Sequence, residues 1–283
     1  MIDETVEEIR EMQTHSSSVV AVRAARALED LLDREFASVA EYERDLERNS
    51  SALRRANPSH ASLWSTQRRI LAAVEDRNAE TVEEAKSATA AVIDAVVDDV
   101  GDAKAVAAKN VARRLSDGDV VLTHDYSTTV LEAIELAVGD GVELEVYATE
   151  ARPRFQGRRT ARTLADIEDV SATLIVDGAA GHYLPECDRV LVGMDCIVAN
   201  TLYSRVGTYS LAATAADADV PFVAAGASTK LIDGGFRFKN DFRSASEVLL
   251  EPTEGFEIAN PAYDATPTRL VDHVITDEGT IEP

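Results

Sequence analysis

The segment that decides the fold is VVLTHDYSTTVLEAIELAVGDGVELEVYAT, residues 120–149. It begins with an apolar run at 120–122, continues with a helical stretch at 128–138 and ends with a second apolar run at 144–147. A strand, a helix and another strand in this order predict the βαβ unit of a parallel sheet.

The same alternation continues toward the C-terminus. Further short apolar runs lie at 173–176, 189–192, 221–224 and 274–276. They are uninterrupted and rich in β-branched residues, which is typical of strands buried on both faces of a parallel sheet. Helical stretches at 159–167 and 209–216 separate several of them. We therefore predict an α/β fold with a doubly wound parallel sheet for the second part of the chain.

The first hundred residues predict helices throughout. Val6, Ile9 and Met12 are spaced by three, as on one face of a helix. Further helices are predicted near 39–53, 63–78 and 82–100. The chain changes character after Gly101. The predicted domains are a helical N-terminal domain, residues 1–108, and a sheet domain, residues 109–283.

Length and composition exclude several classes of protein. The 283 residues correspond to about two domains, and 45% hydrophobic with 28% charged residues is a globular composition. No apolar run approaches the roughly 18 residues of a membrane helix, and the acidic N-terminus lacks the order of a signal peptide. Two cysteines, Cys187 and Cys196, cannot form a disulfide framework. We expect a cytoplasmic protein.

The charge is strongly negative. Lys and Arg total 28 against 51 Asp and Glu, a formal net charge of −23, and only five of the basic residues are lysines. Such a chain repels phosphate backbones, so we expect no direct binding of nucleic acid. An acidic surface with little lysine is typical of halophilic proteins, because concentrated salt screens the self-repulsion. An ordinary acidic mesophilic protein is the alternative.

Ligands of open parallel sheets collect beyond the carboxyl ends of the strands. The residues that follow the predicted strands are acidic, basic and hydroxyl-bearing, and they include His124, Asp125, Glu150, Arg152, Asp177, Asp195 and Lys230. In addition, Arg205-Val206-Gly207-Thr208 leads into the helix at 209–216, and backbone N–H groups at a helix start bind phosphate well. The cations Arg152, Arg205 and Lys230, with Gly207 and Thr208, predict a site for a small phosphorylated ligand.

Structural roles for these residues are the alternatives. Asp177 after a strand is expected to cap the next helix. His124 is expected to anchor a loop, and Glu150 with Arg152 to form an ion pair. Cys187 and Cys196 are expected to be packing residues. Arg205 could instead pair with Asp125 or Asp195 and close the pocket. No dinucleotide-binding, P-loop or zinc spacing is found, so we expect no cofactor and no metal.

Six motifs occur in order and carry a resemblance. They are Leu122-Thr-His-Asp-Tyr-Ser, Thr149-Glu-Ala-Arg-Pro-Arg-Phe-Gln-Gly, Gly193-Met-Asp, Val206-Gly-Thr, Asn260-Pro-Ala-Tyr-Asp-Ala-Thr-Pro and Ile275-Thr-Asp-Glu-Gly-Thr-Ile. Together they resemble the family of the alpha, beta and delta subunits of translation initiation factor 2B, which includes ribose-1,5-bisphosphate isomerases and methylthioribose-1-phosphate isomerases. The resemblance implies a helical N-terminal domain, a Rossmann-like domain of the NagB/RpiA/CoA-transferase-like kind, and homo-oligomers, either dimers or hexamers.

The resemblance also implies site residues, and the chain departs from several. The family's isomerases pair a catalytic cysteine after Thr-His with an aspartate; here the aspartate is Asp195, but Asp125 stands at the cysteine's position. Their phosphate-holding Arg-Gly pair corresponds to His15-Ser16. Their Asn-Lys pair corresponds to Ser204-Arg205, and the arginine before a proline to Asn57.

Two functions therefore compete. The departures predict a noncatalytic regulatory or assembly protein like initiation factor 2B, with Asp125 inactive, a sugar phosphate or nucleotide as ligand and initiation factor 2 as a partner. The alternative is an aldose–ketose isomerase on ribose 1,5-bisphosphate or a related phosphorylated sugar, with Asp125 in the cysteine's role. Two carboxylates at short range would then share a proton and provide an acid beside a base.

Overall fold

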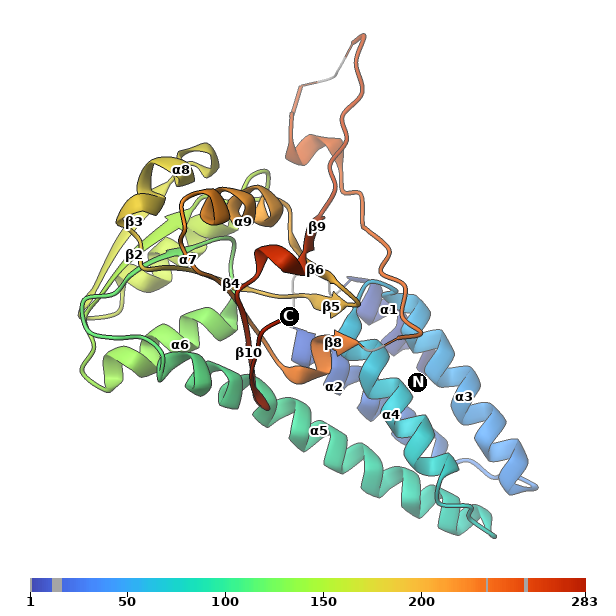
Figure 1. Ribbon diagram of the computed structural model, residues 1–283. Helices are drawn as coiled ribbons and strands as arrows, with labels where there is room; N and C mark the ends of the chain where they lie inside the picture. Colours follow the sequence, from blue (N-terminus) through green and yellow to red (C-terminus); the bar gives the residue numbers. More distant parts are fainter. Residues whose placement is uncertain (1, 12–16, 233, 252–253) are drawn as a thin grey trace. The chain divides into compact units, whose positions relative to one another are not determined.

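The computed structural model describes residues 2–11, 17–232, 234–251 and 254–283 (Figure 1). The chain divides into two compact units. Met1–Ala103 with Thr229–Lys239 form one, which we call the helical unit; Lys104–Ser228 with Asn240–Pro283 form the other, the sheet unit. None of the helices in the described part of the chain is long and apolar enough to cross a membrane.

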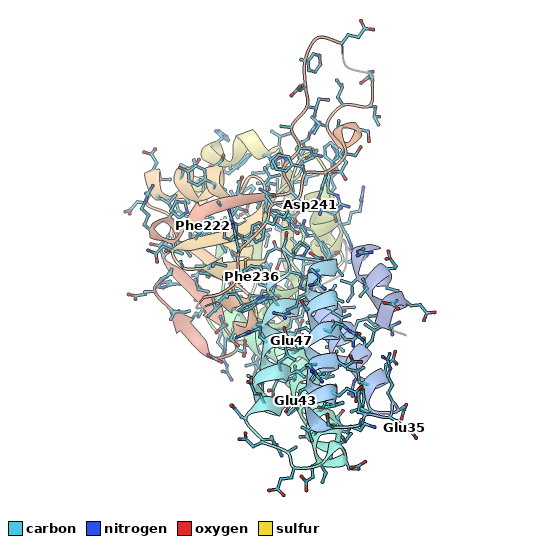
Figure 2. All side chains as sticks on the ribbon, turned by 90° about the vertical axis from the view of Figure 1, so that its right-hand side faces the viewer. Glu35, Glu43, Glu47, Phe222, Phe236 and Asp241 are labelled. Atoms are coloured by element: carbon cyan, nitrogen blue, oxygen red, sulfur yellow. The ribbon has the colours of Figure 1, made fainter. Side chains whose placement is uncertain are left out.

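The helical unit is built from amphipathic helices and one short strand. Its elements are α1 (Ile2–Glu11), α2 (Ser17–Ala27), α3 (Val39–Ala56), α4 (Ala61–Glu75), the first part of α5 (Val82–Ala112) and β8 (Leu231–Ile232). Its core is mainly aliphatic, and the most buried members include Ile9, Leu28, Leu46, Leu53, Leu63, Ile70 and Ile93. Figure 2 shows that acidic side chains such as Glu35 and Glu47 lie on the outside of this unit.

Local chemistry explains where these helices begin. The Ser38 hydroxyl accepts a hydrogen bond from the backbone N–H of Glu41 at 3.3 Å, and the Glu41 carboxylate accepts one from the N–H of Ala37 at 2.8 Å. This reciprocal pattern satisfies two backbone donors at the start of α3. Inside the unit, the Tyr42 hydroxyl donates to Oγ1 of Thr89 at 2.7 Å, so this buried phenol keeps a polar partner.

Helix α5 is longer than its sequence predicts. The apolar pattern predicts an end near Gly101, but the helix continues for 31 residues to Ala112. Gly101 is exposed and costs about 1 kcal/mol relative to alanine in a helix interior. Burial of Val100, Ala107 and Ala108 on the same helix offsets that cost. The boundary between the two units therefore falls within a continuous helix and not at a flexible linker.

The sheet unit contains a seven-stranded sheet in the order β11-β10-β7-β4-β1-β2-β3. Every neighbouring pair is parallel except β10 and β11. The strands are β1 (Val120–Thr123), β2 (Leu144–Thr149), β3 (Val170–Ile175), β4 (Arg189–Gly193), β7 (Phe222–Ala225), β10 (His273–Thr276) and β11 (Gly279–Ile281). The prediction of an α/β fold with a helical N-terminal part and a parallel-dominated sheet is confirmed.

Helices cover both faces of this sheet (Figure 1). The end of α5, α6 (Thr128–Gly139) and α7 (Gln156–Ala165) pack around one apolar core, and α8 (Ala180–Tyr183) and α9 (Thr208–Asp217) lie over the other face. The central strands are buried on both faces, as predicted. Strand β3 differs, because it is the edge of the sheet and its Ser171 and Leu174 are exposed.

Five of the described strands were not predicted: β8, β11 and three strands that pair with one another. β5 (Cys196–Val198), β6 (Thr201–Arg205) and β9 (Tyr263–Pro267) are antiparallel neighbours, with β6 between the other two. Their residues mix polar and apolar types, and β9 lies 58 positions after Arg205 in the chain, where Tyr263 pairs with that arginine. This small sheet brings Asp195, Arg205 and Tyr263 beside the carboxyl ends of the parallel strands.

Candidate active site

His124 ties together three segments at the carboxyl end of β1. The buried ring contacts Oγ1 of Thr149 through Nδ1 at 2.6 Å and the carbonyl oxygen of Val206 through Nε2 at 2.9 Å. The expectation that this histidine anchors a loop is confirmed. Its ring also explains Gly207, where φ is 107° and a Cβ would lie 2.7 Å from Cε1 of His124. Only glycine fits there.

Asp125 follows directly in a left-handed conformation, with φ of 63°. A residue with a Cβ adopts it at a cost on the order of 1 kcal/mol, and such strain collects at functional sites. The hydroxyl of Thr160, on α7, donates to the Asp125 carbonyl at 2.6 Å and holds the turn in place. The turn directs the carboxylate toward Arg205, whose Nε lies 3.5 Å from Oδ2 of Asp125.

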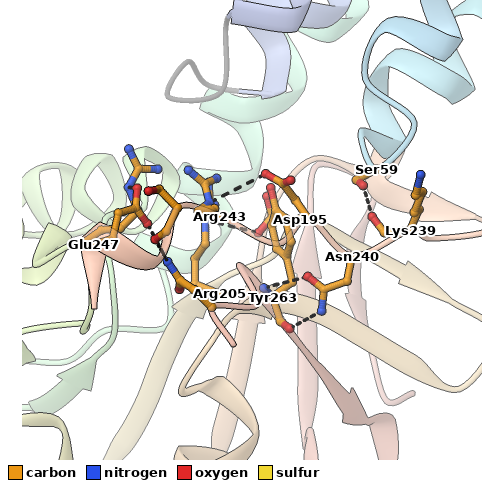
Figure 3. Close-up of polar contacts among 12 residues, drawn as sticks. Ser59, Asp195, Arg205, Lys239, Asn240, Arg243, Glu247 and Tyr263 are labelled. Atoms are coloured by element: carbon orange, nitrogen blue, oxygen red, sulfur yellow. Dashed lines mark hydrogen bonds and ion pairs between the residues drawn. The ribbon is translucent and has the colours of Figure 1, made fainter. Parts of the chain in front are cut away.

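Arg205 is the centre of the site (Figure 3). Besides Asp125, its Nε lies 4.0 Å from Oδ2 of Asp195, and its guanidinium lies 4.8 Å from the centre of the Tyr263 ring. Burial on its own lowers the pKa of Arg205, but Asp195, Tyr263 and Asp125 outweigh burial and raise the pKa well above its ordinary value. The alternative in which Arg205 pairs with a carboxylate is therefore the one found. Arg205 pairs with both Asp125 and Asp195.

Asp195 is positioned by backbone contacts on both sides. It lies between β4 and β5, and its N–H donates to the carbonyl of Tyr203 at 3.0 Å. The preceding Met194 N–H donates to the carbonyl of Ala225 on β7 at 3.2 Å. No helix begins at Asp195, so the carboxylate is directed into the site and not at a helix start.

The start of α9 differs from the expectation. The N–H groups of Gly207 and Tyr209 donate to one carboxylate oxygen of Asp264 at 2.8 and 3.0 Å, and the buried Thr208 hydroxyl donates to the Arg205 carbonyl at 2.6 Å. The backbone donors that sequence reasoning assigned to a phosphate are thus occupied by an aspartate from β9. Asp264 has the usual role of an anion at a helix N-terminus.

The loop after β2 is held by Asp177. Its two carboxylate oxygens accept hydrogen bonds from the N–H groups of Ala151 and Arg152, both at 2.7 Å. The expectation that Asp177 caps the next helix is wrong, because its side chain satisfies backbone donors on the neighbouring loop instead. Gly157 completes this packing, since a Cβ there would lie 1.7 Å from the Thr149 carbonyl oxygen.

The expected Glu150–Arg152 ion pair is also wrong. Glu150 pairs with Arg158 at 2.9 Å, on the first turns of α7. Arg152 instead donates to the carbonyl of Val248 at 3.3 Å and lies 5.0 Å from the ring centre of Phe155. Arg152 therefore faces the segment 240–262. Lys230 ends a short turn in the helical unit, and its assignment to the phosphate site stays a prediction.

The chain differs from the family's isomerases at further positions. Those among the described residues form hydrogen bonds with nearby backbone groups. The Ser204 hydroxyl donates to the Gly193 carbonyl at 2.9 Å and joins β6 to the end of β4. Asn57 ends α3, and its carbonyl accepts from the N–H of His60 at 3.2 Å. His15 and Ser16 lie outside the described residues.

Both cysteines are buried. Cys187 donates through Sγ to the Tyr183 carbonyl at 3.3 Å, and burial raises the pKa of its thiol to about 11. Cys196 is fully buried in β5, next to Asp195 in the chain. A buried thiol with a raised pKa is a poor nucleophile at neutral pH. Cys187 is therefore a packing residue, as expected.

Sequence reasoning missed Arg154, Arg243, Glu247 and Tyr263. Arg154 follows Pro153 in the loop after β2, and its Nε lies 3.5 Å from Oε1 of Glu247. Arg243 and Glu247 come from the segment 240–262, which has no apolar period and follows no predicted strand. A signal was available for Arg154, which lies within the Arg-Pro-Arg motif after a strand, and for Tyr263, which lies within the motif at 260–267.

The arrangement has a definite chemical capacity. Two carboxylates from different strands face one permanently charged guanidinium at the carboxyl edge of a parallel sheet. Carboxylates give and accept protons, and an arginine between them offsets their mutual repulsion and can orient an anionic or oxygen-rich ligand. The site therefore suits acid–base chemistry on a small polar substrate.

Comparison with known proteins gives relatives over the whole chain. A ribose 1,5-bisphosphate isomerase of Haloterrigena turkmenica is 36% identical over 99% of this chain and 89% of its own length. One of Methanocaldococcus jannaschii is 32% identical over 100% and 92%. Among solved structures, the translation initiation factor eIF-2B of Pyrococcus horikoshii OT3 has a TM-score of 0.81 and 24% identity over 100% of this chain and 97% of its own.

These relatives correct the functional prediction. The departures around Asp125 predicted a noncatalytic protein, but four relatives at 31–36% identity, each aligned with at least 99% of the chain, are named ribose 1,5-bisphosphate isomerase. The noncatalytic prediction is therefore wrong. That prediction rested on departures at a few positions, whereas these relatives match almost the whole chain.

The family itself follows from the whole chain. The profile of the Initiation factor 2 subunit family (IF-2B) matches residues 13–283, which include all six motifs and every residue of the site described above. Together with the relatives, this match confirms the resemblance. The chain belongs to the Initiation factor 2 subunit family.

Proposed function

We propose that the protein is an aldose–ketose isomerase that acts on ribose 1,5-bisphosphate or a closely related phosphorylated pentose. The observation that carries the proposal is the pair Asp125 and Asp195, held on either side of Arg205 at 3.5 and 4.0 Å. The relatives named ribose 1,5-bisphosphate isomerase support the choice of substrate class.

The reaction defines what the two carboxylates must do. When a ribose 1-phosphate ring opens, the bond from C1 to the ring oxygen breaks and that oxygen takes a proton. The hydrogen on C2 moves to C1 with its bonding electron pair, which replaces the pair that left with the ring oxygen, and the C2 hydroxyl loses its proton as C2 becomes a ketone. The net change moves hydrogen within one molecule, so one acid and one base are sufficient. Asp125 and Asp195 are assigned these two roles.

Asp125 replaces a thiol with a carboxyl group at the same point of the chain. A carboxyl group reaches a similar distance and transfers protons, although it is a weaker base than a thiolate. Its left-handed backbone and the Thr160 hydrogen bond hold it in place. Arg205 lies close to both aspartates and offsets their repulsion, which lets two carboxylates share one small site.

Arg152 and Lys230 remain proposed phosphate ligands. Arg152 has the exposure that such a role needs, and the loop that carries it is fixed by Asp177. Gly207 and Thr208 shape the site through His124 and the Arg205 carbonyl. The backbone N–H groups of Gly207 and Tyr209 donate to Asp264, so direct phosphate binding at this helix start needs Asp264 to move.

The test is an isomerase assay of the purified protein on ribose 1,5-bisphosphate in molar potassium chloride. Turnover on the order of 1 per second or faster supports the proposal. Asp195→Asn should lower it at least roughly a hundredfold, the usual share of one acid–base group. The matched control, Glu168→Gln, neutralises an exposed carboxylate in the same unit and should leave turnover unchanged. No turnover by the wild type, or equal rates for both variants, would refute it.

We further propose that the protein is a halophilic, archaeal-type member of the family. The net charge of −23 supports this, as do relatives from Haloterrigena turkmenica and Haloferax volcanii. Melting temperatures in potassium chloride should rise strongly between 0.01 M and 1 M, over which the Debye length falls from about 30 to about 3 Å. A melting temperature independent of salt would show that self-repulsion is unimportant here.

We also propose that copies of the chain associate. The support is a fold shared with the eIF2B-beta2-delta2 complex of C. thermophilum, a tetramer, at a TM-score of 0.80. Light scattering in molar salt should give a mass at least twice the 30.5 kDa of one chain. A monomeric mass would contradict this proposal and would leave the isomerase assay unaffected.

A further inference from the structure

Arg243 is a buried arginine with an unused donor. Its side chain is only 7% exposed, and among the described residues its Nε has no hydrogen-bond partner. The nearest carboxylate, that of Asp241, lies 3.9 Å from this Nε, which is beyond hydrogen-bond distance. A buried charged donor that lacks a hydrogen bond is costly, so an anion bound there would stabilise Arg243.

Arg154 lies close by, on the loop after β2. Its Nε reaches Oε1 of Glu247 only at 3.5 Å, and it is a little more than a quarter exposed. Burial lowers the pKa of Arg154, and the positive charges of Arg243 and Arg205 lower it further. Three guanidinium groups are thus gathered in one partly shielded region of the sheet unit, and Figure 3 shows Arg205, Arg243 and Glu247 close together there.

Glu247 is the carboxylate placed among these cations. Asn260 holds its Oε2 at 3.1 Å through Nδ2. The backbone around it is tied down as well, since Arg243 N–H donates to the Asn260 carbonyl at 2.9 Å. The carboxylate therefore has a fixed partner on one oxygen and a long contact to Arg154 on the other.

We propose that Arg154 and Arg243 form a subsite for one phosphate group of the sugar substrate, and that Glu247 occupies this subsite until the phosphate displaces it. A phosphate has more acceptor oxygens and more charge than a carboxylate, so it can satisfy both guanidinium groups at hydrogen-bond distance. The inference rests on the proposed isomerase function for the identity of the sugar. The phosphate of that sugar needs a holder other than the amides at the start of α9, because Asp264 occupies those amides.

The position of the subsite matches this role. Arg205 links it to the two aspartates, because Arg205 lies close to Arg243 and Glu247 in Figure 3 and pairs with both Asp125 and Asp195. A phosphate bound by Arg154 and Arg243 would therefore hold the sugar beside the two aspartates. Arg154 and Arg243 are positioned to bind substrate, and neither contacts Asp125 or Asp195 in an ion pair that the structure describes.

The experiment is titration calorimetry in molar potassium chloride with ribose 1,5-bisphosphate, ribose 5-phosphate and inorganic phosphate. Arg243→Gln and Arg154→Gln should each weaken binding of the bisphosphate roughly 10- to 100-fold, the usual value of a charge-assisted hydrogen bond. Glu247→Gln should strengthen it, because no competing carboxylate has to leave. Arg269→Gln, which removes an exposed arginine of the same unit, is the matched control and should bind as wild type does.

The tighter binding of Glu247→Gln keeps the test falsifiable, because a variant that merely folds badly cannot gain affinity. Wild-type affinity in both arginine variants, or weaker binding in Glu247→Gln, overturns the subsite while turnover by the wild type still supports the isomerase. Loss of phosphate binding in the arginine variants of a protein without turnover supports the subsite and refutes the isomerase. No binding of any of the three ligands by the wild type overturns the subsite.

Discussion

The ion pairs of the helical unit and those of the sheet unit differ in how far their side chains are exposed to water. The distances between the paired atoms do not show this difference. In the helical unit Arg26 and Asp94 approach to 2.6 Å, but their side chains are 39% and 63% exposed. In the sheet unit Arg205 lies 3.5 Å from Asp125, yet these side chains are only 28% and 17% exposed. Water screens the shorter pair and much less the longer one, so the longer contact has the stronger electrostatic effect.

The difference shows how the two units use charge. In the helical unit the core is aliphatic and the charged pairs surround it, so stability comes from apolar burial. In the sheet unit charged side chains enter the carboxyl edge of the sheet, where they are held by backbone contacts and constrain one another. The helical unit is therefore expected to tolerate the loss of one charged side chain. The site at the edge of the sheet is expected to lose its function when one of its charges is removed.

Substitutions at Asp125 are the strongest test of the claim that the site in the sheet unit depends on its charged side chains. Asp125→Asn keeps the shape but cannot transfer a proton, and should lower turnover about 100- to 10,000-fold. Asp125→Cys introduces the cysteine that the resemblance places at this position in the family's isomerases. This variant should retain turnover. Single-turnover assays with both variants decide the matter. Full activity in Asp125→Asn would show that the Asp125 carboxylate is structural.

If apolar burial stabilises the helical unit, a substitution that removes apolar contacts there should cause a large loss of stability. Leu53 is fully buried on α3, and Leu53→Ala should lower the free energy of unfolding by about 2–5 kcal/mol, through lost burial and the remaining cavity. Urea unfolding followed by circular dichroism measures the change. A loss below about 1 kcal/mol would mean that this core repacks easily.

Cys187 offers a pH test within the sheet unit. Burial raises the pKa of its thiol to about 11 from 9.0, so the unfolded chain loses this proton first as pH rises. Stability linked to Cys187 is complete below about pH 9 and is lost as the pH approaches 11, with a size of about 1–2 kcal/mol. Unfolding curves at pH 8.5 and 10.5 should therefore show a smaller fall in Cys187→Ala than in wild type. Equal falls would exclude the thiol as the cause.

The smallest effect is expected at the surface of the helical unit. Arg26 pairs with both Glu29 and Asp94, yet Arg26→Gln should change the free energy of unfolding by no more than about 1 kcal/mol, because exposed pairs contribute little. The effect should shrink further in molar salt. A change above about 2 kcal/mol would remove the contrast between the two units.

Local sequence patterns predict most of the parallel sheet and much less of the site. Apolar β-branched runs identify β1, β2, β4, β7 and β10, because buried strands need such runs. β6 escapes prediction from uninterrupted apolar runs, because its buried residues alternate with the partly exposed Thr201, Tyr203 and Arg205, as in a half-buried strand. Asp125 and Asp195 follow from the rule that ligands gather at strand ends, and Arg205 follows from its place just before the helix at 209–216.

The partners of these residues could not be predicted in the same way. Asp264 reaches Gly207 across 57 positions, and Asp177 reaches Ala151 across 26. Each aspartate satisfies backbone donors of a distant loop, which no spacing rule describes. Arg243 lies in a segment without periodicity, so its burial depends entirely on tertiary packing.

The carboxylate of Asp264 at the start of α9 has a consequence for biosynthesis. A ribosome adds about 5–20 residues per second, so the 57 positions between Gly207 and Asp264 take roughly 3–11 s to translate. During that interval the nascent helix has two unsatisfied N–H groups beside Arg205, and neither Tyr263 nor β9 has been made. The edge of the sheet that carries the site therefore cannot assemble until this late segment emerges, and a slow codon cluster between residues 208 and 263 would prolong the exposure of an incomplete, charged site.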